Sequence, residues 1–179
     1  MLKLIRSCLE LKYNEIMDVY GESLRNAAKT EYRGFDRNEA VILAEQDFYA
    51  YIREVFFCTE GAVYVVWEEK DHYISAARVE PYEGGLLIAG LETKPDCRNQ
   101  GYGYKLLSAL VAYCEVSNLS ALYSHVEKRN APSLTVHEKC GFERISESAI
   151  YIDGIVSGEA CTMRYLPAER HGCEDVKRC

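Results

Sequence analysis

The chain has 179 residues, 48% of them hydrophobic, and a formal net charge of −7 at pH 7. This length and composition predict one globular domain with an ordinary hydrophobic core. The negative charge argues against a protein that binds nucleic acid without regard to sequence. The longest apolar runs, 62–67 and 86–91, are far shorter than the roughly 20 residues of a membrane helix. We therefore expect a soluble cytoplasmic protein that binds neither nucleic acid nor a membrane.

The N-terminal segment and the cysteines indicate in which cellular compartment we expect the protein. Lys3 and Arg6 interrupt the first residues, which lack the apolar stretch and cleavage site of a secretion signal. The eight cysteines include no Cys-x-x-Cys pair, so we expect reduced, mostly buried thiols and no metal site. Cys173 and Cys179 lie in a polar tail. The predicted organisation is a single domain over 1–166 and a tail over 167–179.

The first half of the chain predicts a strand, two helices and a strand pair. A short strand is expected within 2–8, and apolar residues between 12 and 32 recur at helical spacing. Asp36 is a suitable N-cap for a second helix that extends to Val55. Residues 62–67 and 73–81 predict strands joined by a charged turn over 68–71. The Gly84-Gly85 pair then predicts a hairpin turn into the next strand.

The stretch 86–111 carries the functional prediction. Its run 86–92 is mostly apolar and predicts a strand buried on both faces. Pro95 follows it, and proline has no N–H to continue a strand ladder. The turn RNQGYG over 98–103 comes next, and leucines then recur at helical spacing up to Leu110. The predicted order is strand, glycine-containing turn and helix.

This order suits an anion, because the first N–H groups of a helix are unpaired and its N-terminus is partly positive. Gly101 and Gly103 allow the backbone to approach a ligand closely, and Arg98 adds a fixed positive charge. A plain tight connection is the alternative interpretation. The turn matches neither the P-loop nor the dinucleotide fingerprint.

The last third of the chain predicts three more strands and one helix. A strand is expected over 119–127, followed by a helix that Asn130 or Ser133 opens and Gly141 ends. Segments 142–152 and 160–166 predict a closing antiparallel pair around an Asp-Gly turn at 153–154.

Two blocks resemble the GNAT acetyltransferase superfamily. The Arg98-x-x-Gly101-x-Gly103 turn is similar to the family's coenzyme A pyrophosphate loop. Segment 126–142 is similar to a second family block, in which Asn-x-x-Ala/Ser precedes a helix that ends in Tyr-Glu-Lys-x-Gly-Phe. His137 stands where the family has tyrosine, which is the one departure that we note. The resemblance implies an α/β fold, with a mixed, mostly antiparallel sheet of about seven strands and helices on both faces.

The resemblance also implies a reaction, acyl transfer from acetyl-coenzyme A to an amine without a metal. The cofactor contacts that it implies are Leu91, Thr93, Arg98, Asn99, Gln100, Gly101, Tyr102, Gly103, Tyr104, Asn130 and Ser133. Backbone N–H groups around Thr93 would hold the thioester carbonyl, and Asn130 has a plain N-cap as its alternative role. Lys105, Lys128 and Arg129 are candidates for the 3′-phosphate, with ordinary solvated side chains as the alternative.

Three side chains are candidates for proton transfer. An amine of pKa about 10.4 is mostly protonated at pH 7, so a base has to remove its proton. Glu92 is the first candidate, because part burial at a strand end raises the pKa of a carboxylate, and a surface salt bridge is the alternative. His125 is the second candidate, although a strand histidine is more often simply packed. His137 would donate to the departing sulfur, or else pack against its helix.

The predicted function is an acetyl-coenzyme A-dependent N-acetyltransferase. A small amine, a peptide N-terminus and a protein lysine all stay open as acceptors, and a homodimer is one possible assembly. The rival hypothesis is a catalytically silent acyl-coenzyme A-binding module of the same fold, which the tyrosine-to-histidine change at 137 keeps open.

Overall fold

The computed structural model describes residues 1–117 and 121–167. The main sheet is built from β1 (Leu2–Ile5), β2 (Val63–Glu69), β3 (His72–Tyr82), β4 (Gly85–Thr93), β5 (Leu122–Glu127), β6 (Glu143–Ser146) and β9 (Ala160–Tyr165). The α-helices are α1 (Tyr13–Glu31), α2 (Arg37–Glu54), α3 (Tyr102–Val116) and α4 (Ala131–Lys139). Short 3₁₀ helices span Phe56–Cys58 and Pro95–Cys97, and β7 (Ala149–Ile150) and β8 (Val156–Ser157) form a hairpin.

The seven strands of the main sheet have the order β1-β2-β3-β4-β5-β9-β6. Every neighbouring pair is antiparallel except β4 and β5, which are parallel. The expectation of a mixed, mostly antiparallel sheet is therefore confirmed. The parallel pairing is short, because it joins only residues 86–88 of β4 to residues 122–124 of β5.

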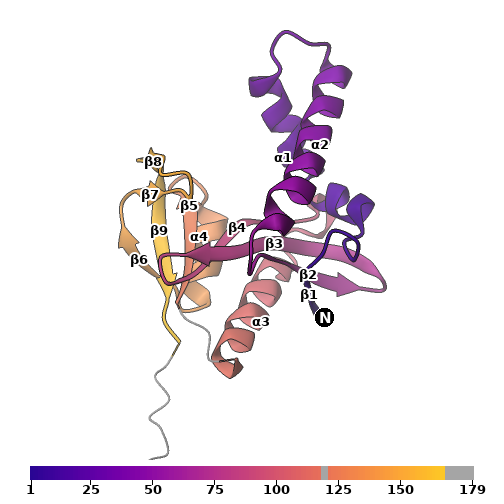
Figure 1. The fold of residues 1–179 in the computed structure, drawn as a ribbon. Coiled ribbons are helices and arrows are strands. Elements are labelled where there is room, and N and C mark those ends of the chain that lie inside the picture. Colours follow the sequence, from indigo (N-terminus) through magenta and orange to yellow (C-terminus); the bar gives the residue numbers. More distant parts are fainter. Residues whose placement is uncertain (118–120, 168–179) are drawn as a thin grey trace, which may run out of the picture.

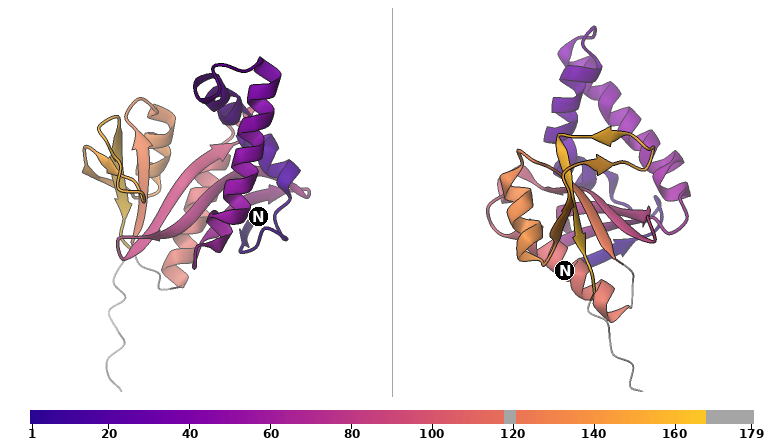
Figure 2. Two further views of the ribbon diagram at one scale, coloured as in Figure 1. Left: turned by 45° about the horizontal axis from the view of Figure 1, so that its top comes forward. Right: turned by 90° about the vertical axis from the view of Figure 1, so that its left-hand side faces the viewer.

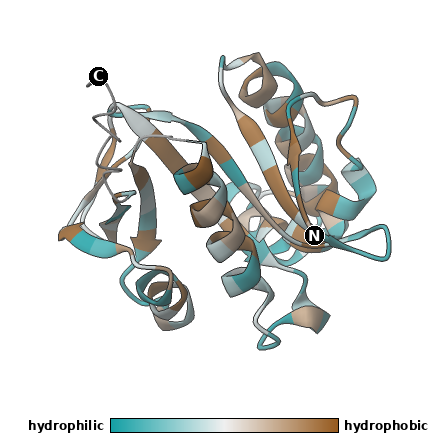
Figure 3. Cartoon of the chain, turned by 90° about the horizontal axis from the view of Figure 1, so that it is seen from below, coloured by the Kyte–Doolittle hydropathy of each residue, from teal (hydrophilic) through white to brown (hydrophobic). Residues whose placement is uncertain are grey.

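Helices cover both faces of this sheet (Figure 1). On one face, α1 and α2 bury Ile16, Val19 and Ile52 against Tyr64 and the other apolar side chains of β2 and β3. On the opposite face, α3 and α4 pack over a core that includes Leu106, Leu110, Val126 and Met163. The turn between α1 and α2 projects beyond the sheet (Figure 2). Seen from the α3 side, hydrophobic residues concentrate along the strands, and polar residues dominate the turns (Figure 3).

The predicted helices are confirmed to within a few residues, and Asp36 caps α2 by accepting from the Asn38 N–H at 2.8 Å. The charged turn is shorter than predicted. Glu68 and Glu69 belong to β2, and only Lys70 and Asp71 form the turn, with φ of 49° and 65°. The predicted strand 2–8 ends at Ile5.

The prediction for 142–152 is wrong in part. Strand β6 pairs with β9 as expected, but it ends at Ser146, and the Asp153-Gly154 turn belongs to the separate β7–β8 hairpin. The break has a local cause, because the Ser146 hydroxyl accepts the Ser148 N–H at 3.1 Å and turns the backbone away from the ladder. The Thr162 hydroxyl donates a hydrogen bond to the Ser148 carbonyl at 2.8 Å.

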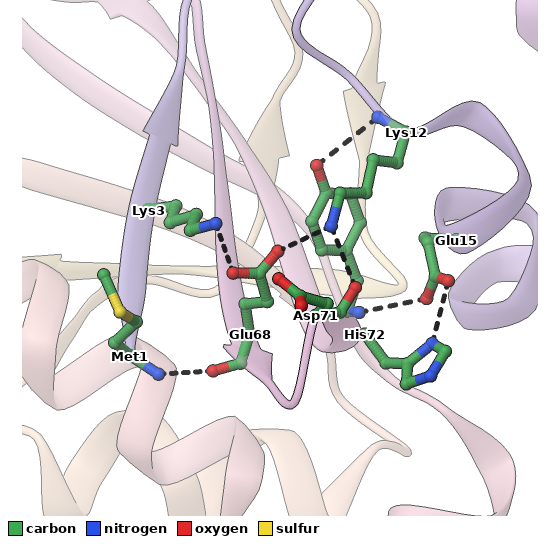
Figure 4. A network of polar contacts seen from close by, with 8 residues as sticks. Met1, Lys3, Lys12, Glu15, Glu68, Asp71 and His72 are labelled. Atoms are coloured by element: carbon green, nitrogen blue, oxygen red, sulfur yellow. Dashed lines mark hydrogen bonds and ion pairs between the residues drawn. The ribbon is translucent and has the colours of Figure 1, made fainter.

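A polar network ties the N-terminus to the β2–β3 hairpin (Figure 4). Glu68 is only 6% exposed and forms ion pairs with Lys3 and Lys12, the latter at 3.0 Å. Hydrogen bonding to Lys3, opposed by burial, holds the pKa of Glu68 below its usual value. Glu15 of α1 accepts from the Tyr73 N–H at 3.1 Å and meets His72 at 2.9 Å.

Of the six cysteines in the described part of the chain, Cys114, Cys140 and Cys161 are buried, and all six are free thiols. The predicted tail from 168 onward, with Cys173 and Cys179, lies outside the described residues, as does the predicted strand start at 119–120. Within the part of the chain that the structure describes, no helix combines the length and the apolar character needed to span a membrane. Nor do the residues placed there include a cluster of three or more metal-ligating side chains.

Candidate active site

The site is built around the end of β4, where the sheet stops being continuous. Beyond Ile88 no residue of β4 pairs with β5. On the other side, Ala76 pairs with Glu92 and Arg78 with Ala89, so Gly90 and Leu91 form a bulge opposite one residue of β3. Gly90 has φ of +60° and is exposed although it lies in a central strand.

The separation of β4 from β5 after Ile88 corrects one prediction. The run 86–92 was expected to be buried on both faces, yet only Leu87 and Ile88 are buried. The reason is that the strand loses its β5 neighbour after Ile88, so the residues that follow lie at an open edge inside the sheet. Backbone N–H and C=O groups at such an edge are free to meet a ligand.

The first turn of α3 faces the same end of β4. Gly101 is its N-cap with φ of +79°, as the prediction of a glycine turn requires, and no side chain caps the helix. A Cβ added at Gly101 would meet nothing within 4 Å, and one at Gly103 would meet only Thr93 Oγ1 at 3.6 Å. Because neither glycine is crowded by protein atoms, the space beside this turn is open. The donors and the space fit a phosphate group.

Two side chains of the turn are already engaged within the protein. Arg98 donates through Nε to the Thr93 carbonyl at 3.1 Å, and its Nη1 lies 2.5 Å from Oε2 of Glu22 on α1. Tyr102 donates to Oε2 of Glu69 at 2.9 Å, and Lys105 lies 4.2 Å from the centre of the Tyr102 ring. These contacts fix the turn between α1 and the β2–β3 hairpin. Asn99, with φ of +60°, and Gln100 and Tyr104 are exposed.

Glu92 is half-buried at the end of β4, on the sheet face that α1 covers. Burial raises the pKa of Glu92, and the Ser23 hydroxyl of α1 and the charge of Arg98 oppose this rise. The expected direction of the pKa shift is therefore confirmed. The role of Glu92 as general base stays a prediction.

His125 lies on β5 between two tyrosine rings. Its ring centre is 5.4 Å from that of Tyr82 and 5.3 Å from that of Tyr151, and its Nδ1 is 3.3 Å from Thr162 Oγ1. Burial lowers the pKa of His125, and a hydrogen bond to the Ile150 backbone opposes this effect. These contacts belong to the β7–β8 side of the molecule, and no contact joins His125 to Glu92.

His137 is 1% exposed on α4. Its Nδ1 donates to the Ser133 carbonyl at 2.8 Å, and its ring meets Phe142 edge-on at 5.2 Å. Burial lowers the pKa of His137, and Nε2 is buried without a hydrogen-bond partner. The imidazole is therefore neutral at pH 7, and its N–H is already used within α4. Its role at sulfur stays a prediction.

The remaining predicted contacts are placed as follows. Asn130 accepts the Ser133 N–H at 3.1 Å, which is the predicted N-cap. Lys128 pairs with Glu147 at 3.5 Å and Arg129 with Glu159 at 3.6 Å, so both basic side chains have partners within the protein. Leu91 packs against the core that α3 covers.

The structure thus brings Leu91, Glu92, Thr93 and the turn 98–104 together, and it adds residues that the sequence did not point to. Ser23 and Glu22 approach from α1, and Glu69 approaches from the β2–β3 hairpin. The helical spacing of apolar residues predicts the buried face of α1. It does not predict which exposed residues of α1 contact the turn before α3, which follows much later in the sequence.

A model of the acetyltransferase (GNAT) family matches residues 21–142, which is more than half of the chain. The chain belongs to this family. Curated relatives are the L-methionine sulfoximine/L-methionine sulfone acetyltransferases of Pseudomonas aeruginosa and Pseudomonas paraeruginosa, each 32% identical over 73 residues. That segment is 40% of this chain and 42% of each relative, so the match spans less than half of their length.

Solved GNAT structures share the fold. The PaiA N-acetyltransferase of Thermoplasma acidophilum in complex with coenzyme A is 13% identical with a TM-score of 0.62, covering 93% of this chain and 99% of that one. The ribosomal-protein-alanine N-acetyltransferase of Brucella melitensis is 17% identical with a TM-score of 0.60, covering 93% and 99%. The uncapped turn before α3 and the divergence of β4 from β5 therefore belong to an acetyltransferase fold.

Proposed function

We propose that this GNAT protein is an N-acetyltransferase that transfers an acetyl group from acetyl-coenzyme A to an amine acceptor. One observation carries the proposal: a carboxylate with a raised pKa, Glu92, lies at the open end of β4, next to the uncapped first turn of α3. A proton acceptor and an anion-binding turn are the two protein parts that this reaction needs.

In this proposal the first turn of α3 binds the diphosphate of the coenzyme through its free backbone N–H groups, with Gly101 and Gly103 giving access. The bound thioester supplies the acetyl group. Glu92 takes the proton of the acceptor ammonium, directly or through one water, and the neutral nitrogen attacks the thioester carbon. Backbone N–H groups at the β4 bulge stabilise the negative charge on the carbonyl oxygen. The carbon–sulfur bond breaks, the nitrogen releases its second proton to solvent, and the sulfur leaves as a thiolate that takes a proton from solvent.

The acceptor class is the finer part of the proposal. The Pseudomonas relatives are named for L-methionine sulfoximine and L-methionine sulfone, which supports a small acceptor. The Brucella structure is named for a ribosomal-protein alanine, which keeps peptide N-termini in the test panel. A protein lysine completes the panel.

The test is thiol release from acetyl-coenzyme A across a panel of small amines, amino acids, peptides and a lysine-rich protein, with mass detection of the acetylated product. Acetylated product with at least one class of amine supports the proposal. Tight binding of acetyl-coenzyme A with no product from any class would instead favour a silent binding module, and the neutral, internally bonded His137 is the observation behind that alternative.

A further inference from the structure

Arg78 of β3 is a half-buried arginine that the steps above do not use. It forms no ion pair with any described carboxylate, because no ion pair of the structure includes it. Its Nε is buried without a hydrogen-bond partner, and its guanidinium carbon lies 5.1 Å from the centre of the Tyr51 ring on α2. A half-buried positive charge without a carboxylate partner is costly for a folded protein.

Tyrosine hydroxyls contact Arg78, and the Tyr51 hydroxyl accepts a hydrogen bond from it. Tyr64 of β2 is 0% exposed, and its hydroxyl has no hydrogen-bond partner. Burial raises the pKa of Tyr64 and of Tyr51, and the charge of Arg78 opposes the rise in both. The two phenols therefore stay protonated, so that neither adds a negative charge beside the guanidinium.

The nearest carboxylates do not neutralise Arg78. Glu80 lies two residues along the same strand, and burial raises its pKa while Arg78 opposes this rise. The charge of Arg78 also acts weakly on Glu92, which bonds instead to Ser23. Neither carboxylate lies within ion-pair distance of the guanidinium, so the positive charge of Arg78 has no ion-paired counterpart among the described residues.

The guanidinium of Arg78 lies beside the β4 bulge, together with the Tyr20 ring, whose Cε1 would lie 3.5 Å from a Cβ added at Gly90. A Cβ added at Gly90 would lie 3.3 Å from an Nη atom of Arg78, so the guanidinium sits directly beside this residue. Gly90 is exposed, and its carbonyl is held by the Tyr20 hydroxyl at 2.6 Å. Gly90 and Glu92 both face α1, because a Cβ added at Gly90 would lie 3.5 Å from the Tyr20 ring and Glu92 bonds to Ser23. An anion that enters at Gly90 therefore reaches Arg78 from the side on which Glu92 lies.

We propose that Arg78 binds a carboxylate of the acceptor, so that the substrate is a small amine with a free carboxylate, of the amino acid class. The planar guanidinium can donate hydrogen bonds to both carboxylate oxygens, with the tyrosine hydroxyls as further donors. The proposal rests on the proposed function. It gives Arg78 a role in selecting the acceptor and no role in the transfer of the acetyl group. The competing explanation is that Arg78 only stacks on Tyr51 to stabilise the fold.

The experiment compares amino acids with their own carboxamides, which keep the amine and lose the charge. The series includes α-alanine, β-alanine and γ-aminobutyrate, which vary the spacing between amine and carboxylate. For the wild-type protein we expect kcat/KM to favour the free acid by about 10- to 100-fold, the range for a hydrogen bond to a charged group. In Arg78→Gln, KM for the acid should rise by a similar factor while the carboxamide and the affinity for coenzyme A stay unchanged. Arg78→Lys should restore part of the preference.

Arg53→Gln is the matched control, because Arg53 also stacks on a tyrosine ring, that of Tyr49 at 5.5 Å, but lies exposed and paired with Glu54. Equal use of acids and carboxamides by the wild type, or an equal loss for both in Arg78→Gln, would overturn the proposal while leaving acetyl transfer intact. If no amine is acetylated, the proposed function fails. Calorimetry of amino acid binding, with coenzyme A present, then still tests whether Arg78 binds a carboxylate. Amino acid binding that Arg78→Gln abolishes supports the carboxylate site, and no binding of any acid to the wild type overturns it.

Discussion

Arg98, in the turn before α3, forms an ion pair with Glu22 of α1, with Nη1 2.5 Å from Oε2. One helical turn earlier, Asp18 pairs with Lys94 at 2.6 Å. These two contacts tether α1 to the residues that connect β4 with α3. Helix α1 and the proposed cofactor turn are therefore in direct electrostatic contact.

The ion pair gives a first prediction. A bound diphosphate would compete with Glu22 for Arg98, so Glu22→Gln should raise the affinity for coenzyme A by roughly threefold, as expected for removing a partly exposed ion pair. Titration calorimetry at low and high salt measures this, and the gain should shrink at high salt. Asp18→Asn is the control, because it loosens the same tether without touching Arg98. An unchanged affinity in Glu22→Gln would mean that Arg98 does not meet the diphosphate.

Gly103 gives the second prediction. Its Cβ position is open except for Thr93 Oγ1 at 3.6 Å, so a side chain there fits the protein but enters the space beside the turn. Gly103→Glu should abolish coenzyme A binding in calorimetry and keep the circular dichroism spectrum, whereas Gly103→Ala should weaken binding less. Gly34→Glu serves as control, because a Cβ there meets nothing within 4 Å and lies in the α1–α2 turn. Wild-type affinity in Gly103→Glu would refute the cofactor turn.

Glu92 gives the third prediction. Glu92→Gln keeps the shape and removes the proton acceptor, so kcat/KM at pH 7 should fall by about 10²–10⁴. Burial raises the pKa of Glu92, and the base form predominates only above that pKa. The wild-type rate should therefore rise with pH through the raised pKa, and this acidic limb should vanish in Glu92→Gln. Coenzyme A affinity is the control measurement. A rate that barely changes would assign proton removal to His125 or to water.

His137 gives the fourth prediction. Burial lowers its pKa and Nδ1 bonds to the Ser133 carbonyl, so the neutral ring cannot protonate a thiolate at pH 7. We expect His137→Phe to lower kcat by at most about tenfold, and by the same factor at pH 6 and pH 8.5. His137→Tyr, which restores a hydroxyl, should retain or improve activity. A deficit of His137→Phe that appears only at pH 6 would show that the imidazolium does take part.

Glu68 gives the fifth prediction, on stability. Its pKa is held low by Lys3 and Lys12, so its contribution is present above the unfolded pKa of about 4.3 and is lost as the pH falls through the lower folded value. Glu68→Gln should reduce the free energy of unfolding by about 1–3 kcal/mol at pH 7, and the difference should fade toward pH 3. Denaturant unfolding at both pH values measures this, with the exposed Glu60→Gln as control. A pH-independent deficit would point to packing instead.

Local patterns sufficed for much of this architecture. The helical spacing of apolar residues, the Asp36 cap and the glycine at 101 each depend on neighbours within a turn or two, and each appears in the structure as expected. The glycine turn between β4 and α3 was predicted correctly, because its sequence and its place after a strand are both local.

Long-range contacts were beyond reach for a physical reason. Whether β4 is buried depends on where its neighbour β5 leaves it, and no residue of 86–92 encodes that distance. The unpartnered state of Arg78 likewise depends on side chains from β2 and α2, and the ion pair of Arg98 depends on α1. In the sequence, an arginine in a strand looks the same with or without a carboxylate beside it.

The short parallel contact between β4 and β5 divides the sheet into two halves. Among the described residues, three residue pairs join β4 to β5, whereas seven join β2 to β3. Opening this seam therefore breaks few bonds, and amide hydrogens at 86–88 and 122–124 should exchange with solvent sooner than those of β2 and β3. A molecule lying in the seam would bridge the two halves, so ligand binding should register as slowed exchange along both strands.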